Sequence, residues 1–263
     1  MISVKRHIAA PAAAAALGAL VLAACGAKPP SVAAEGAEAT AQDYLSPPKV
    51  DTVRAGPGGV TLAGTASVGG KVRLATPIGQ AMFSTVDAHG RWVIALPPAA
   101  DARIFGVSAS TGGRQTQAEG YLLVTPDGKA AMLRAGASAL RIDPVARPGL
   151  RSIDFDRGGG VEVAAQVSPG ATVILHLDGR QADERRADAN GRYEVSLGSP
   201  TPIRPGAHQI EVRGDGFADQ VAVRVSPAQP LAQGPLRSQL TPAGPRVDWM
   251  TPGGGVQSTL LIH

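Results

Sequence analysis

Two stretches of the chain repeat each other. Residues 60–96 align with residues 161–197 without a gap, at an offset of 101 residues. The longest match places the segment DAHGRW, which begins at Asp87, on the segment DANGRY, which begins at Asp188. Self-similarity over this length indicates two copies of one folding unit.

Within each copy, apolar and polar residues alternate over short runs, as they do in half-buried strands. Such runs begin at Val60 and at Val161, and Gly and Pro residues separate them from the next runs. The shared Asp and Gly are typical of tight turns, because Asp accepts hydrogen bonds from main-chain amides and Gly adopts positive φ. Trp92 and Tyr193 follow these turns at positions expected to face a core. The pattern predicts an all-β chain of short strands in a sandwich or a barrel.

The repeat resembles a bacterial immunoglobulin-like (Ig-like) domain. The resemblance is carried by the V-x-L/V opening strand, the Gly-Gly or Pro-Gly turn, and the D-x-x-G-R-W/Y turn and strand. It covers about residues 57–126 and 157–227 and implies a β-sandwich in each copy. The paired cysteines of antibody domains are missing, because the chain has a single Cys. A resemblance at the level of the fold does not imply an activity.

These features predict two tandem Ig-like β-sandwich domains, at residues 51–147 and 148–227. The remaining residues, 228–263, begin with a Pro-rich connector and end in apolar runs around a Gly-rich segment. We expect a C-terminal β-hairpin there. Trp249 lies just before the Gly-rich turn. It is expected either to pack on the second sandwich or to contact a partner or a ligand such as a sugar ring.

The N-terminus has the layout of a secretory signal. Lys5 and Arg6 precede an apolar run from Ile8 to Leu22, and small residues then lead to Cys25. A membrane-spanning helix needs about 20 apolar residues, so this run is short for a span. The pattern predicts a signal peptide over residues 1–24.

The sequence Leu-Ala-Ala-Cys that ends at Cys25 resembles the lipobox of bacterial lipoproteins. The resemblance implies acylation of the Cys25 thiol, cleavage before it and acylation of the new amine. Two or more acyl chains give stable anchoring to a membrane. By the same resemblance, Gly26 favours the outer membrane. The alternatives are a secreted protein in which Cys25 is incidental and a retained signal anchor.

Residues 25–50 are predicted to be the lipidated Cys and a disordered linker. The segment is rich in Ala, Pro, Glu and Gly and has almost no large apolar residues. Such a composition buries too little surface to offset the entropy of ordering. We expect a semi-extended tether between the membrane and the folded part.

The charge of the chain does not indicate binding to nucleic acid. Removal of residues 1–24 leaves 23 basic and 21 acidic residues, a formal charge of about +2. No cluster of Lys and Arg is interleaved with aromatic residues, as nucleic-acid interfaces require. Scattered charges of both signs are typical of a solvated surface.

We find no catalytic constellation, cofactor motif or metal-ligand spacing in the sequence. His176 and His208 have no Cys or carboxylate at ligand spacing. The acidic residues of several predicted turns are candidates for calcium but lack the full calcium-loop pattern, so solvated turns are the simpler interpretation. They are Asp154, Asp156, Asp183, Glu184 and Asp188, with Asn190 beside them.

The sequence therefore favours a cell-envelope protein held to the membrane by an N-terminal lipid. Its Ig-like modules would act as a spacer and a scaffold for another envelope protein. A carbohydrate- or peptidoglycan-binding module is the first alternative, with Trp249 as its candidate contact. A periplasmic hydrolase is the second alternative, although no catalytic residues were found for it.

Overall fold

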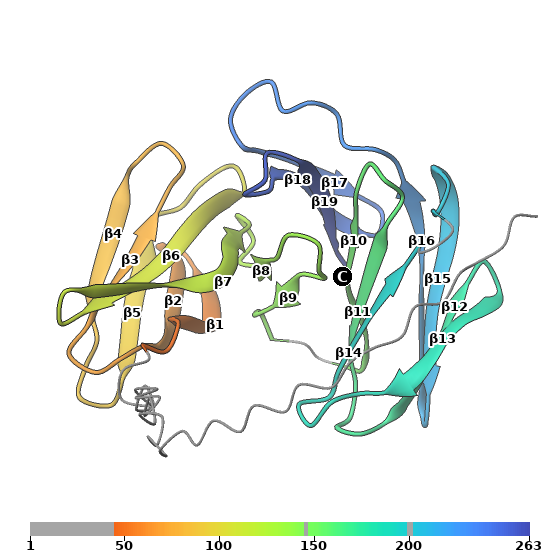
Figure 1. Ribbon diagram of the computed structural model, residues 1–263, viewed down its shortest axis with the longest axis horizontal. Coiled ribbons are helices and arrows are strands. Elements are labelled where there is room, and N and C mark those ends of the chain that lie inside the picture. The colour runs from red at the N-terminus through yellow and green to blue at the C-terminus, as the bar shows by residue number, and fades with distance from the viewer. Residues whose placement is uncertain (1–44, 145–146, 199–201) are drawn as a thin grey trace, which may run out of the picture. The chain divides into compact units, whose positions relative to one another are not determined.

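The computed structural model describes residues 45–144, 147–198 and 202–263 (Figure 1). The predicted signal peptide, Cys25 and nearly all of the predicted linker lie outside the described residues. The described residues form strands and connecting turns and contain no helix. This confirms the all-β prediction.

The first sandwich is built from two antiparallel sheets. The smaller sheet has the strand order β1-β2-β5 and the larger one the order β4-β3-β6-β7-β8-β9. The strands are β1 (Lys49–Gly56), β2 (Gly59–Thr65), β3 (Lys71–Ala75), β4 (Ala81–Thr85), β5 (Arg91–Leu96), β6 (Arg103–Thr111), β7 (Arg114–Val124), β8 (Ala130–Leu133) and β9 (Leu140–Arg141).

The second sandwich also has two antiparallel sheets. Their strand orders are β14-β11-β10-β19-β18-β17 and β13-β12-β15-β16. The strands are β10 (Gly149–Phe155), β11 (Val161–Gln166), β12 (Thr172–Leu177), β13 (Arg180–Arg186), β14 (Arg192–Leu197), β15 (Gly206–Gly214), β16 (Phe217–Val225), β17 (Leu236–Thr241), β18 (Gly244–Met250) and β19 (Val256–Leu261).

Alternation along each strand produces the two cores. In β5, Trp92, Ile94 and Leu96 are buried while the residues between them are exposed. They pack with apolar residues from both sheets of the first sandwich. Tyr193 and Val195 of β14 take the equivalent inward positions in the second core. Every second side chain of a strand faces the same side, so the same alternating sequence pattern places apolar residues in the core of each copy.

The shared turn forms as predicted in both copies. The Oδ1 atom of Asp87 accepts hydrogen bonds from the amides of His89 (2.8 Å) and Arg91 (2.9 Å). In the second copy, Oδ1 of Asp188 accepts the equivalent hydrogen bonds from the amides of Asn190 and Arg192, both at 2.8 Å. Gly90 and Gly191 follow with φ of 75° and 76°. Since Asn190 replaces His89 without changing the turn, the histidine is not needed for this geometry.

The C-terminal segment differs from the expected appended hairpin. The hairpin of β18 and β19 is present, but β17 joins it, and β19 pairs with β10 from Ser152↔Leu261 to Phe155↔Ser258. The three strands therefore extend a sheet of the second sandwich. The physical reason is that apolar residues occupy both faces of β19: Leu260 enters the second core and Leu261 packs on the opposite side.

Gly191→Ala tests the shared turn. A Cβ at Gly191 would lie 2.1 Å from the carbonyl oxygen of Val167, whereas a Cβ at Gly179 meets nothing within 4 Å. Both glycines have φ of 76°. We expect Gly191→Ala to lower the free energy of unfolding by about 2–4 kcal/mol and Gly179→Ala by about 1 kcal/mol. Urea denaturation measures both, and equal losses would show that the close approach is not important.

Candidate functional site

The C-terminal strands bury a third apolar cluster, which lies between the two sandwiches. β18 and β19 contribute Val247, Trp249 and Leu261, and the outer face of β6, β7 and β8 contributes the facing side chains. Those facing residues include Ile104, Leu123, Ala131 and Leu133. The cluster places the outer faces of two sheets from different sandwiches against each other.

Trp249 is at the centre of this cluster and is 0% exposed. The Tyr121 ring meets its indole edge to face, with ring centroids 6.1 Å apart and planes at 82°. The indole Nε1 donates to Oγ1 of Thr259 at 3.1 Å, so its one polar atom is satisfied. Trp249 thus has no exposed face for a sugar or a partner, and it packs on the first sandwich as well as on its own sheet.

A buried polar network surrounds the tryptophan. Thr259 also donates to Oδ1 of Asp154, and Oδ2 of Asp154 accepts the amide of Ala139 at 2.9 Å. Ser152 donates to the carbonyl of Ala139 at 3.0 Å. Asp154 is therefore not the solvated turn acid that the sequence suggested. The pairing of β10 with β19 buries it, and the network ties the β8–β9 turn of the first sandwich to the second.

Gln257 extends the network to the same turn. Its Nε2 donates to the carbonyls of Arg134 and Ala137, both at 3.2 Å, and its Oε1 accepts the amide of Gly136 at 3.0 Å. The Arg134 guanidinium then reaches both carboxylate oxygens of Glu194 on β14 at 2.9 Å. That ion pair is partly exposed and contributes at most about 1 kcal/mol. The buried contacts of Gln257 give the junction its geometric specificity.

Burial raises the pKa of Asp154 to about 6, against an ordinary value of 3.8. The hydrogen bonds from Thr259, Ala139, Gln257 and Ser152 act in the opposite direction and do not offset it. The folded state favours the neutral acid more than the unfolded chain does, because a buried carboxylate without a cation partner is costly. Protonation of this one group is therefore linked to the stability of the junction.

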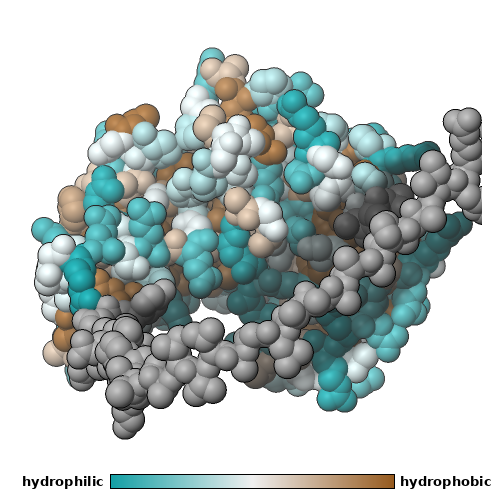
Figure 2. Space-filling model, in the orientation of Figure 1, coloured by the Kyte–Doolittle hydropathy of each residue, from teal (hydrophilic) through white to brown (hydrophobic). Residues whose placement is uncertain are grey.

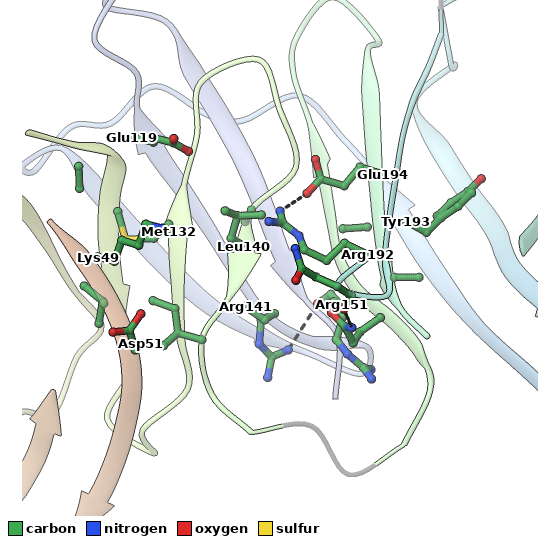
Figure 3. A pocket seen from close by; sticks show the side chains of 18 of the residues that line it. Lys49, Asp51, Glu119, Met132, Leu140, Arg141, Arg151, Arg192, Tyr193 and Glu194 are labelled. Carbon is green, nitrogen blue, oxygen red and sulfur yellow. Dashed lines mark hydrogen bonds and ion pairs between the residues drawn. The ribbon is translucent and has the colours of Figure 1, made fainter. Parts of the chain in front are cut away.

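A slot of about 770 Å³ lies beside the junction and is lined by both sandwiches (Figure 3). β1 supplies Lys49 to Asp51, and β9 supplies Leu140 and Arg141. The second sandwich supplies Arg151 of β10 and residues of β11 and β14. In Figure 3, Lys49 and Asp51 lie on one side of the slot, with Arg151, Arg192 and Glu194 on the other. A cavity of this size is large enough for a small ligand or a short peptide.

The charged side chains of the slot differ in how they are compensated. Arg192 pairs with Glu194, and Arg141 pairs with Asp143. Arg151 is 7% exposed and has no ion pair among the described residues. It donates only to the main-chain carbonyls of Leu150 (2.8 Å) and Arg147, and its Nε has no partner there. Sequence reasoning missed Arg151, since nothing in the local pattern distinguishes it from a surface arginine.

The predicted turn acids do not come together. Asp156 caps its own turn through the amide of Gly160, and Asp183 pairs with Arg185 and accepts the hydroxyl of Tyr193 at 2.8 Å. His208 instead bonds Asp178 at 2.8 Å. Within the described ranges, no group of three His, Cys, Asp or Glu side chains is placed to hold a metal ion.

The remaining surface has no large apolar area in the face shown in Figure 2. Hydrophobic residues lie there singly or in small groups between hydrophilic ones. Among the described residues, the large hydrophobic side chains that are exposed are Val68, Ile78, Phe83, Val93, Leu240 and Met250. Isolated exposed residues of this kind are normal on a folded protein. The part of the chain that the structure describes contains no helix long and apolar enough to cross a membrane.

The chain matches no protein-family profile, and no curated protein matches its sequence. Solved structures to which the chain is similar include the BSP domain of a biofilm-associated protein, at 12% identity and a TM-score of 0.24. That alignment covers 70% of this chain and 30% of the other.

Two further structures are an ice-binding, Ca2+-stabilized adhesin of an Antarctic bacterium and the central fibronectin-III array of RIM-binding protein. The adhesin is 15% identical with a TM-score of 0.22, covering 83% of this chain and 66% of that one. The array is 10% identical with a TM-score of 0.25, and the alignment covers 82% of this chain and 88% of the array. The chain thus spans less than a third of the biofilm protein and 66% of the adhesin. At these scores, the activities of those proteins are not transferred to this one.

Stability should depend on pH through Asp154. Its pKa is higher folded than unfolded, so its contribution is fully present below about pH 4 and is lost as the pH rises through 6. Relative to Asp154→Asn, the native chain should gain roughly 1–2 kcal/mol between pH 8 and pH 5. Urea denaturation of both chains at the two pH values measures this gain. A difference between them that stays constant with pH would contradict the assignment.

Proposed function

We propose that this chain is a lipid-anchored protein of the cell envelope whose two Ig-like sandwiches act together as a spacer and a protein-interaction scaffold. The observation that carries the proposal is the junction around Trp249. It buries an apolar cluster from both sandwiches and satisfies the polar groups around it. A scaffold of this kind presents surfaces from two sandwiches in one fixed arrangement.

The anchor is supported by the sequence alone. Cys25 follows a signal-like segment and is the only cysteine of the chain. An anchor at Cys25 and a Pro-rich tether before Lys49 would leave both sandwiches at the distal end. The described residues themselves fall within one compact unit. The membrane would therefore hold one end of the chain and leave the surfaces of the two sandwiches free for a partner.

The carbohydrate-binding alternative requires exposed aromatic side chains, and the candidate residues are buried. Sugar platforms use exposed aromatic rings, and Trp92, Trp249 and Tyr193 are 1%, 0% and 1% exposed. Among the described aromatic residues, only Phe83 is largely exposed, at 54%, and the Lys71 ammonium lies 5.0 Å from its ring centroid. No geometry among the described residues favours this alternative over the scaffold.

Trp249→Ala tests the fixed arrangement. Spin labels on cysteines introduced at Thr85 of β4 and Arg186 of β13, in a Cys25→Ser background, report the distance between the sandwiches. We expect a narrow distribution in the parent chain and a broad one in Trp249→Ala, because the substitution removes the largest side chain of the cluster.

Met250→Ala is the matched control, since this neighbour of Trp249 is 43% exposed. It should leave the distance distribution narrow. A distribution that is already broad in the parent chain would show that the two sandwiches move independently, and the scaffold in one fixed arrangement would be rejected.

Cys25→Ser tests the anchor and the envelope role together. In cells, the parent chain should sediment with the membrane fraction and cross-link to envelope proteins. The Cys25→Ser chain should leave that fraction and lose those cross-links, because no acylated thiol remains. Membrane association of a correctly processed Cys25→Ser chain would refute the lipid anchor. A parent chain that cross-links to no envelope protein would refute the scaffold.

A further inference from the structure

The slot between the sandwiches is bordered by the outer strands of the two sheets of the first sandwich. β1 is the outer strand of the order β1-β2-β5, and β9 is the outer strand of the larger sheet of the same sandwich. Both contribute residues to the slot, Lys49 to Asp51 from β1 and Leu140 and Arg141 from β9. The slot therefore lies where the first sandwich is open, and the second sandwich closes its far side (Figure 3).

β1 offers main-chain groups for pairing. Over its eight residues, its only strand partner among the described residues is β2. An edge strand carries a row of N–H and C=O groups that point away from its one neighbour. An extended peptide can add to such a row, because its own main chain supplies the complementary donors and acceptors.

The wall beside β1 is apolar and continuous with the first core. Val50, Leu140 and Ile142 are partly buried against that core, and Met132 belongs to it at 9% exposure. All four line the slot. Every second side chain of an added strand would face this wall, so the wall favours β-branched or other apolar residues at alternate positions.

The opposite side of the slot holds a buried cation, Arg151, that makes no direct ion pair with a carboxylate of the described residues. A buried guanidinium is normally paired with a carboxylate, and leaving it unpaired is costly. Arg151 has two main-chain acceptors and no carboxylate partner among the described residues. Burial, and then the neighbouring Arg141 guanidinium, lower the pKa of Arg151 to about 10, and the nearby carboxylates of Asp219 and Asp143 act in the opposite direction without offsetting this. A carboxylate brought by a ligand would supply the missing partner.

We propose that the slot binds an extended peptide segment of a partner protein, which adds to the free edge of β1 and places a carboxylate against Arg151. The edge supplies main-chain hydrogen bonds, the apolar wall selects alternate side chains, and Arg151 selects an acidic residue. The inference rests on the proposed scaffold function and names the class of partner that the slot would take.

Selection from a random octapeptide library on the immobilised full-length chain tests this assignment. Enriched peptides should alternate apolar and polar residues and share an Asp or a Glu. Changing that acid to its amide in a selected peptide should weaken binding about tenfold or more, as measured by fluorescence anisotropy. Methylation of alternate peptide nitrogens should abolish binding, because it removes main-chain donors.

Arg151→Gln identifies the partner of the peptide carboxylate. The substitution should weaken binding of the acidic peptide about tenfold and leave binding of the amide peptide unchanged. The effects of changing Arg151 and of changing the peptide acid are then not additive. Arg180→Gln, at an exposed position of β13 outside the slot, is the matched control and should change neither. Additive losses, or equal binding of acid and amide peptides, would overturn the role of Arg151.

Hydrogen exchange locates the peptide without any substitution in the protein. A selected peptide should protect amides of β1, and those of β17, the edge strand of another sheet, should exchange as before. Protection of β17 alone, or no enriched peptide, would overturn the slot as a peptide site. Cross-links to envelope proteins in cells would still be expected in that case, so the two proposals fail separately.

Discussion

The indole of Trp249 is enclosed by apolar side chains from both sandwiches, and its Nε1 is bonded to Thr259. Full burial of a large aromatic side chain contributes several kcal/mol, and its edge-to-face contact with Tyr121 adds specificity. Asp154 and Gln257 beside it are hydrogen-bonded to Thr259 and to the main chain of the β8–β9 turn. Because these contacts join β18 and β19 to β6, β7 and β8, the relative placement of the two sandwiches depends on them.

That placement creates the slot. The open side of the first sandwich, between β1 and β9, is covered by the outer face of a sheet from the second. Neither sandwich alone would bring Arg151 close to the free edge of β1. The same packing buries the Arg151 guanidinium without a direct carboxylate partner among the described residues, and a carboxylate of a ligand would supply one. The junction and the proposed peptide site are therefore consequences of one interface.

Sequence reasoning succeeded where structure is local. The turns of Asp87 and Asp188 form as expected because their hydrogen bonds span no more than four residues. The inward positions of Trp92 and Tyr193 follow from the alternation of a strand. The environments of Trp249 and Asp154 could not be predicted from the local sequence, since distant segments of the chain form them. Gln257 and Arg134 are 123 residues apart along the chain, and no local pattern specifies their contact.

The sequence by itself determined that the chain is all-β, that it contains two related sandwiches and where their turns fall, because alternation and turn chemistry act over a few residues. It also supplied the prediction of a lipid anchor at Cys25, which lies outside the described residues. Only the tertiary structure decided that the C-terminal strands join the second sandwich and pack on the first. Both faces of β19 are buried, Leu260 in the second core and Leu261 in the cluster at the first sandwich, and where such a strand is buried depends on packing between segments far apart in the chain.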